Sequence, residues 1–324
     1  MNIDRSEIFY AADMAIIRKD KMKKPTQEAV AAWQVGNGPK YSPVGKTIDK
    51  VESGEYIFEE DLNDNLWAVK QNTVTDNLID LPGLPTSFIL DQIKIFWDKT
   101  DEFKHYGFLQ KRGIMLYGPP GTGKSSIIAL LKRQLVDMGG VVFGMGDGGY
   151  SQLVSGLRGF RSVEKHRPIM TIVEDIETHL EGSNGSNMAK QEPDALALYD
   201  GAFQIDNVVH IATTNKPEVI ADRFIRRPGR FDIVIGLFGP SAETREAYLR
   251  GICKQELTEQ QVREIVDATK GLSLAYMREV AVTYLVLGIP LVDTISRLKH
   301  NSKQDFSRKE GFELGFTSKP NLNS

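Results

Sequence analysis

A glycine-rich turn between an apolar run and a helix start constrains this chain more than any other segment. Residues 118–125 read Gly-Pro-Pro-Gly-Thr-Gly-Lys-Ser, with the strand-like run 113–117 before them and the helix-like run 126–131 after them. Glycines let the backbone curl so that successive N–H groups point at phosphate oxygens, and the helix N-terminus adds partial positive charge. Strand, glycine loop and helix in this order predict a phosphate-binding loop.

The last residues of this turn carry the chemistry that a bound nucleotide requires. Lys124 is expected to reach the outer phosphates, and the hydroxyl of Ser125 is expected to coordinate magnesium. The alternative is a turn that matches the pattern by chance, and both flanking runs argue against it. The residues expected to hold the nucleotide are Gly118, Pro119, Pro120, Gly121, Thr122, Gly123, Lys124, Ser125 and Ser126.

From residue 113 onward, strand candidates alternate with helices and then give way to helices alone. The strand candidates are 113–117, 140–145, 168–174, 208–213 and 232–237. Such alternation predicts a parallel sheet with helices on both faces, within an α/β domain over 86–239. The helices expected after Pro240 are 242–255, 259–270, 273–288 and 290–300. They predict a small all-helical domain over 240–300, followed by a polar tail over 301–324.

The N-terminal region, residues 1–85, is expected to combine helices and strands and to bind a client or an adaptor. The elements expected here are helices at 4–18 and 25–34 and strands at 56–58 and 66–69. The run Leu-Pro-Gly-Leu-Pro at 81–85 predicts a linker. A helix from Ser87 to about Tyr106 is expected to follow it.

Composition excludes several classes of function. A formal net charge of −3 gives no global signal for nucleic acid or acidic lipid as a partner. The single cysteine, Cys253, excludes an intramolecular disulfide, and the five histidines show no metal-ligand spacing. No run approaches the length of a membrane span and no secretion signal follows Met1, so we expect a cytoplasmic location without a membrane partner.

Two adjacent acids, Glu174 and Asp175, end the apolar run 169–173. Two like charges at the carboxyl end of a strand favour a cation beside them, and a magnesium nucleotide is such a cation. Ligands of parallel α/β sheets bind at the carboxyl ends of the strands. One acid is therefore expected to hold magnesium and the other to polarise the attacking water, with two solvated acids as the alternative.

Polar residues also follow the next strand candidate. Asn215 is expected to hydrogen-bond the γ-phosphate or the attacking water, and the alternative is an Asn that caps the following turn. Arg226, Arg227 and Arg230 lie on a Pro-Gly turn that can present arginines to a phosphate bound by a neighbouring subunit. A basic surface turn is the alternative, and it applies most to Arg226.

The order of these motifs resembles the AAA+ ATPases, and specifically their AAA clade. The sequences GPPGTGKS, IVED, IATTN and RRPGRFD, followed by a helical lid, occur in register over about residues 85–300. The resemblance implies a P-loop NTPase fold and the hydrolysis of ATP, with ATP and Mg²⁺ as cofactors. It also implies a homo-oligomeric ring, expected to be a hexamer, with the nucleotide between subunits.

The resemblance assigns a role to each matching position. The positions that match catalytic residues of the family are Glu174, Asp175, Asn215, Arg227 and Arg230. The first two are the Walker B acids, the third is sensor 1, and the two arginines are fingers that act on the neighbouring subunit. The residues implied around magnesium are Ser125, Glu174 and Asp175.

This chain departs from the usual pattern of the family at several positions. The usual Asp-Glu pair is reversed to Glu174-Asp175, which favours Asp175 as the catalytic acid and Glu174 as the acid beside the metal, with the assignment open. The same order resembles the mitochondrial AAA translocase that moves the folded Rieske protein. The stretch that matches the family's pore loop, 154–156, has no aromatic residue, so Tyr150 or Phe160 could replace it or be packed in the core.

The lid differs from other AAA+ branches in one position. Ala275 lies where those branches carry a sensor 2 arginine, and Arg278, one helical turn further on, is a weak candidate for that role.

Three functions fit these features. The first is a ring motor that remodels or translocates a protein client. The second is a nucleic-acid-associated motor or loader, supported only by local basic residues. Those residues are Arg18, Lys19, Lys21, Lys23, Lys24, Arg297, Lys299, Lys303, Arg308 and Lys309. The third is a scaffold whose assembly ATP controls, which the intact hydrolysis motifs disfavour.

Overall fold

The structure is a computed structural model that describes residues 32–35, 41–44, 47–62, 65–72, 81–181, 188–203, 205–218, 220, 229–253 and 257–303. It divides into two compact units, residues 1–51 and residues 52–324. In the first unit, strands β1 (Ala32–Val35) and β2 (Tyr41–Val44) pair antiparallel. The predicted helix 25–34 is wrong at its end, because residues 32–35 pair as a strand. The predicted helix 4–18, the residues 25–31 and the tail beyond 303 lie outside the described residues.

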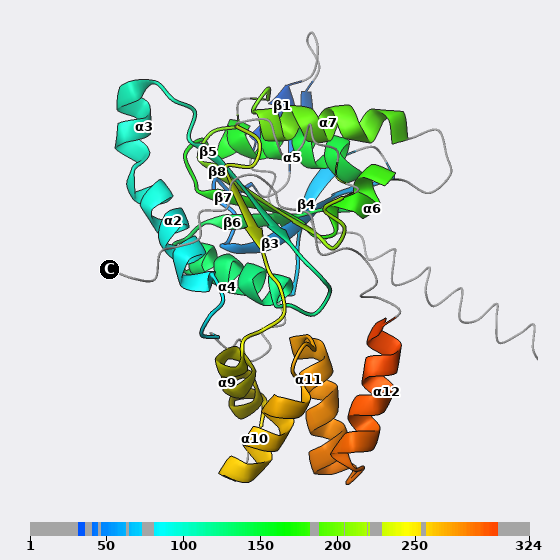
Figure 1. The fold of residues 1–324 in the computed structure, drawn as a ribbon. Coiled ribbons are helices and arrows are strands. Elements are labelled where there is room, and N and C mark those ends of the chain that lie inside the picture. Colours follow the sequence, from blue (N-terminus) through cyan, green and yellow to red (C-terminus); the bar gives the residue numbers. More distant parts are fainter. Residues whose placement is uncertain are drawn as a thin grey trace, which may run out of the picture. The chain divides into compact units, whose positions relative to one another are not determined.

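The second unit is built on a seven-stranded sheet with the order β4-β3-β6-β7-β8-β5-β9 (Figure 1). Its strands are β3 (Gly54–Glu60), β4 (Leu66–Lys70), β5 (Lys111–Tyr117), β6 (Val141–Gly144), β7 (Ile169–Val173), β8 (Val208–Thr214) and β9 (Ile233–Gly236). All neighbouring strands pair in parallel except β3 and β4, which pair antiparallel. The five strand candidates after residue 113 are confirmed, and so is the α/β fold.

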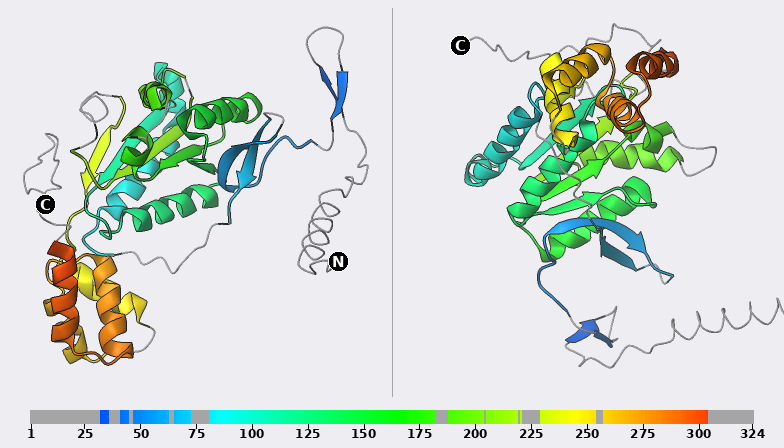
Figure 2. Two further views of the ribbon diagram at one scale, coloured as in Figure 1. Left: turned by 90° about the vertical axis from the view of Figure 1, so that its right-hand side faces the viewer. Right: turned by 90° about the horizontal axis from the view of Figure 1, so that it is seen from below.

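Helices cover both faces of this sheet, as Figures 1 and 2 show. The helices of the α/β part are α2 (Thr86–Asp98), α3 (Thr100–Tyr106), α4 (Lys124–Asp137), α5 (Gly149–Val163), α6 (Ile176–Glu181) and α7 (Met188–Asp200). On one face, Ile93 of α2 and Leu131 of α4 pack with strand residues such as Ile211 in one apolar cluster. Helices α5 and α7 cover the other face, where the Tyr150 and Tyr199 rings meet. Strands β7 and β8 are buried along their whole length because both faces are covered.

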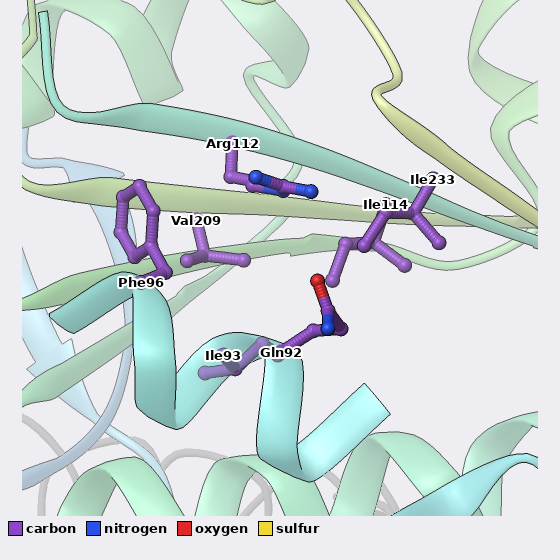
Figure 3. Close-up of a pocket in the computed structure, with 7 residues that line it drawn as sticks. All are labelled: Gln92, Ile93, Phe96, Arg112, Ile114, Val209 and Ile233. Atoms are coloured by element: carbon purple, nitrogen blue, oxygen red, sulfur yellow. The ribbon is translucent and has the colours of Figure 1, made fainter. Parts of the chain in front are cut away.

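Packing between α2 and the sheet leaves only a small gap. Figure 3 shows the residues around it, Gln92, Ile93, Phe96, Arg112, Ile114, Val209 and Ile233. The gap is too narrow for a water molecule, so it is a packing defect of the core rather than a ligand site. The helix predicted from Ser87 to Tyr106 is interrupted at Lys99, where Thr100 Oγ1 donates a hydrogen bond to Trp97 O.

The sheet begins earlier in the sequence than expected. The predicted strands 56–58 and 66–69 form, but β3 pairs in parallel with β6 and so extends the central sheet across the boundary predicted at residue 85. Side chains explain this docking, because the Phe58 ring stacks on Phe143 of β6 at 4.7 Å between centroids. The Phe58 ring also lies against Gly156, where a Cβ atom would come within 2.3 Å of it.

Aromatic residues that the sequence offered for a pore loop lie in helix α5. Residues 154–156 fall inside this helix, and Tyr150 is fully buried with its hydroxyl 3.2 Å from that of Tyr199. The Phe160 ring is half-buried and meets Phe143 edge-on. Of the two alternatives, the structure therefore favours core packing for both aromatic residues.

The C-terminal helices form as predicted. They are α9 (Ala242–Ile252), α10 (Glu259–Ala268), α11 (Leu274–Ala281), the π-helical turn η1 (Val282–Val286) and α12 (Leu291–Lys303). Their apolar faces share one core, to which Leu81 from the predicted linker also belongs. The start of α11 reaches the glycine-rich turn, since Leu274 N donates to Gly121 O at 3.0 Å.

Candidate nucleotide-binding and hydrolysis site

The glycine-rich turn connects β5 to α4 in a shape that requires its glycines. Gly118, Gly121 and Gly123 have φ angles of 145°, 75° and 103°, a region that residues with a Cβ rarely occupy. A Cβ atom on Gly118 would lie 2.0 Å from Leu237 O. Gly118 N also donates to Thr214 O at 3.2 Å, which fixes the turn to the end of β8. The turn is therefore held against two neighbouring strands.

Lys124 opens helix α4 and points back across the turn. It is 7% exposed, and its Nζ donates to Gly118 O at 2.7 Å, to Pro119 O at 3.0 Å and to Asn215 Oδ1 at 2.7 Å. Burial lowers the pKa of Lys124, and the carboxylates of Asp175, Glu177 and Glu174 oppose that effect. An ammonium group held in this way is suited to bind phosphate oxygens.

The two adjacent acids face different partners. Ser125 Oγ donates to Glu174 Oε2 at 2.8 Å, whereas Asn215 Nδ2 donates to Asp175 Oδ1 at 2.6 Å. The backbone of Asp175 is left-handed, with a φ of 47°, and its N–H donates to Thr213 Oγ1 at 3.0 Å. This conformation is strained for a residue with a side chain, and the bonds to Thr213 of β8 and to Asn215 just after it hold Asp175 in place.

The environment of Asp175 makes its carboxylate a stronger base. Burial raises the pKa of Asp175, and the charges of Glu177 and Glu174 raise it further, against the opposing charge of Lys124. A carboxylate with a raised pKa accepts a proton from water more readily.

Sequence reasoning missed two contributors to this arrangement. Glu177 of α6 is 3% exposed, and its Oε1 accepts the backbone N–H of Asn215 at 3.1 Å. Thr213 is buried within β8, and its hydroxyl accepts a hydrogen bond from the backbone N–H of Asp175. The sequence does show a third acid two residues after Asp175 and a threonine within an apolar strand. Neither feature by itself indicates which residue the side chain contacts.

The arginines of the predicted finger turn are only partly described. Arg227 and Arg226 lie outside the described residues. Arg230 is buried, and its guanidinium donates to both carboxylate oxygens of Asp200 at 2.5 and 2.7 Å. The outward presentation expected for Arg230 is therefore not seen, because its charge is compensated within its own subunit. Lys111 Nζ binds the backbone oxygens of Tyr199 and Gly229 beside this pair.

The lid contributes small residues to the turn. A Cβ atom on Gly121 would lie 2.7 Å from Ser273 Oγ and 2.8 Å from Ala275 Cβ. Ala275, which the family resemblance aligns with the sensor 2 arginine of other branches, therefore packs directly on the phosphate-binding loop. Arg278 is exposed on α11.

The donor atoms gathered here fit a magnesium nucleotide. Among the described residues, the carboxylates of Glu174, Asp175 and Glu177 all interact electrostatically with the ammonium group of Lys124, so a bound cation would balance the excess negative charge. The hydroxyl of Ser125 and the carboxylate of Glu174 supply the oxygen ligands that Mg²⁺ prefers. Within the described residues, no group of three or more His, Cys, Asp or Glu is arranged to hold a metal by itself. The fold and these residues define a P-loop nucleotide-binding domain.

Comparison with known proteins identifies this domain. Residues 114–238 match the model of the family "ATPase family associated with various cellular activities (AAA)". The chain is 32% identical over 182 residues to the ATP-dependent zinc metalloprotease FtsH of Aster yellows witches'-broom phytoplasma, a match covering 51% of this chain and 26% of that protein. It is 29% identical over 181 residues to FtsH 2 of Symbiobacterium thermophilum, covering 50% of this chain and 29% of that protein.

A further relative matches more of this chain. FtsH 1 of Symbiobacterium thermophilum is 28% identical over 235 residues, which is 68% of this chain and 38% of that protein. The chain thus spans about a quarter to two fifths of the length of the relatives it matches. The chain contains an AAA ATPase domain with homology to the AAA modules of FtsH proteins, and this domain hydrolyses ATP with Mg²⁺. No helix in the described part of the chain is long and apolar enough to cross a membrane.

Proposed function

We propose that this chain is a ring-forming, ATP-driven motor that remodels or translocates a protein client or complex. The observation that carries the proposal is the hydrogen-bonded set Lys124–Asn215–Asp175, with Ser125–Glu174 beside it, at the end of an AAA sheet. The likeness to the AAA modules of ATP-dependent FtsH proteins supports a protein client. In this proposal residues 1–85 select the client, and the motor works in the cytoplasm.

The residues of the site have separate roles in this proposal. The backbone of the turn and Lys124 hold the phosphates of ATP, and Ser125 and Glu174 hold Mg²⁺, with Asp175 close by. Magnesium, when bound, neutralises charge on the phosphate oxygens. Asp175 orients and deprotonates the attacking water, and Asn215 fixes the position of Asp175. The Ser125–Glu174 and Asn215–Asp175 pairs support this division of labour between the two acids.

A neighbouring subunit completes the site in this proposal. Arg227 acts as the finger on the next subunit's nucleotide, as the family resemblance implies, in a ring expected to be a hexamer. Arg230 is also proposed as a finger residue. Its ion pair with Asp200 supports a second role, in which Arg230 holds the turn that carries Arg227. The Glu-Asp order that resembles the Rieske-protein translocase type supports translocation as the motor's task.

A subunit-mixing experiment tests the ring. Asp175→Asn keeps the finger but lacks the base, and Arg227→Ala keeps the base but lacks the finger. Mixed rings contain some interfaces with both groups intact, so we expect ATPase activity to recover above that of either variant alone. No recovery in mixtures shown to co-assemble, by pull-down of the untagged variant through an affinity tag on the other, would reject a finger that acts in trans.

A capture experiment tests the kind of client. Asp175→Asn protein, immobilised with ATP, is expected to retain proteins from its native lysate that survive nuclease treatment. The Lys124→Ala protein, in which ATP binding is expected to be greatly weakened, is the control bait and is expected to retain none of them. Nuclease-sensitive capture would favour the nucleic-acid motor, and ATP turnover too slow to cycle a ring would favour the scaffold.

A further inference from the structure

A buried acid in this site has no role in the motifs already described. Glu177 is 3% exposed on α6, two residues after Asp175. Its Oε1 accepts a hydrogen bond from Asn215 N, whereas its buried Oε2 has no hydrogen-bond partner among the described residues. A carboxylate in such surroundings is unfavourable for folding, because buried oxygen atoms normally have partners. The unfavourable burial of Glu177 therefore suggests that this residue has a functional role in the site.

Asn215 is the residue that Glu177 contacts, and it connects the catalytic groups. Its Oδ1 accepts from Lys124 Nζ at 2.7 Å, and its Nδ2 donates to Asp175 Oδ1 at 2.6 Å. An ammonium group can only donate and an ionised carboxylate can only accept, so these two partners fix the orientation of the amide. The side chain of Asn215 therefore bridges the group proposed to hold phosphate and the group proposed to activate water.

The backbone at Asn215 needs an anchor, because the strand ends one residue earlier. Thr214 is the last residue of β8, and its carbonyl is used by Gly118 N. Beyond it, the N–H of Lys216 bonds to Thr214 Oγ1. The N–H of Asn215 lies between Thr214 and Lys216, and it donates to Glu177 Oε1 at 3.1 Å. That one bond ties the end of β8 to helix α6, which follows directly from Asp175.

We propose that Glu177 is a positioning residue that acts through Asn215. By accepting the backbone N–H, Glu177 holds the end of β8 where the Asn215 amide reaches both Lys124 and Asp175. The inference rests on the roles proposed above for Asn215 and Asp175. Misplacing an active-site group by about 1 Å can lower a rate by about 100-fold, so loss of this anchor is expected to reduce kcat.

Three substitutions separate positioning from other roles. Glu177→Ala removes the acceptor and is expected to lower kcat about 10- to 100-fold while the Kd for ATP changes less than about 3-fold. Glu177→Gln keeps an acceptor oxygen at the same reach and is expected to retain most of the activity. Glu218→Ala, at an exposed acid three residues after Asn215, is the matched control and is expected to match the wild type. A loss in Glu177→Gln as large as that in Glu177→Ala would show that the charge is what matters and overturn the proposal.

A double-mutant cycle with Asn215→Ala tests whether Glu177 acts through that residue. Asn215→Ala keeps the backbone N–H but removes the bridging amide, so adding Glu177→Ala to it is expected to lower kcat no further than about 2-fold. Independent, multiplicative losses would overturn the proposal, as would a parallel fall in kcat, ATP affinity and melting temperature. If Glu177→Ala does not fold, Glu177→Asp replaces it, because it withdraws the carboxylate by one methylene. Loss of hydrolysis in Asp175→Asn tests the ATPase site separately, so the two failures are distinguishable.

Discussion

The hydrolysis site and the C-terminal helices differ in how far apart in sequence their contacts reach. The bond between Lys124 and Asn215 joins residues 91 positions apart, and that between Asn215 and Asp175 joins residues 40 apart. In the lid, by contrast, helices α9 and α10 begin on local side-chain caps. Thr258 caps α10 through a capping box with Gln261, three residues away.

This difference separates function from stability within one chain. The site gathers charged groups at the ends of strands, where a lost contact mainly disturbs chemistry. The lid derives its order from local caps and one shared apolar core, where a lost contact mainly costs folding free energy. Substitutions can therefore be chosen to affect one region without the other, and those below are ordered from the largest expected effect to the smallest.

Replacing Lys124 is expected to have the largest effect. Lys124→Ala removes the ammonium group from the phosphate-binding turn and is expected to weaken ATP binding at least about 100-fold. A fluorescent ATP analogue measures the affinity. Lys270→Ala, at an exposed position in the lid, is the control. Affinity within a few-fold of the wild type for Lys124→Ala would mean that the turn does not bind phosphate.

The two acids of the site are expected to separate binding from hydrolysis. Asp175→Asn is expected to lower kcat at least about 100-fold while ATP still binds, because an amide cannot take a proton from water. Glu174→Gln is expected to weaken Mg²⁺-dependent ATP binding as well. Steady-state ATPase assays over a range of Mg²⁺ concentrations distinguish them. If Glu174→Gln lowered only kcat and Asp175→Asn weakened Mg²⁺-dependent binding, the proposed roles of the two acids would have to be exchanged.

The contact between lid and turn is the place where the two regions meet. Gly121→Ala would put a Cβ atom 2.7 Å from Ser273 Oγ, and such overpacking typically costs about 1–3 kcal/mol. We expect a lower melting temperature together with weaker ATP binding. Gly271→Ala shares a positive φ, 81° against 75°, but its Cβ would meet nothing within 4 Å, so it controls for backbone strain. If both substitutions had equal effects, backbone strain would explain the loss, and the contact between residue 121 and Ser273 would not.

Acid sensitivity is expected in the core of the α/β unit. Burial, with a smaller contribution from the charge of Lys111, lowers the pKa of His210 to about 3. The unfolded chain then binds this proton first as the pH falls below about 6.5, so the fold loses about 1.4 kcal/mol per pH unit until about pH 3. Urea unfolding from pH 7 to pH 5 measures the slope, which His210→Gln is expected to flatten. His105→Gln, on exposed α3, is the matched control.

The smallest effect is expected from a lid cap. Thr258→Ala removes the capping box of α10 and is expected to cost about 1 kcal/mol, without changing ATP affinity. Thermal unfolding followed by circular dichroism measures it. Ser273→Ala, at the start of α11, removes a buried hydroxyl that makes no cap bond and has no partner in the described structure, so it is expected to be neutral or stabilising. A larger loss for Ser273→Ala than for Thr258→Ala would contradict the local view of lid stability.

Elements with strong local patterns were predictable from the sequence. The strands after residue 113 and the lid helices form where their apolar periods indicate, because period and cap are local properties. Strands β3 and β4 were also predicted, but their place in the central sheet was not. That place depends on pairing with β6 and on the stacking of Phe58 on Phe143, across 85 residues of chain.

The sequence by itself determined that this chain contains a phosphate-binding turn, a pair of acids after a buried strand and a helical domain behind them. Tertiary structure alone decided which acid faces Ser125 and which faces Asn215, because the sequence does not show the left-handed backbone at Asp175 or which side chains lie opposite each carboxylate. It also decided that Glu177 enters the site and that Arg230 pairs with Asp200. Interactions between charged groups depend on their distance in space, and the sequence does not show which strand ends lie next to each other.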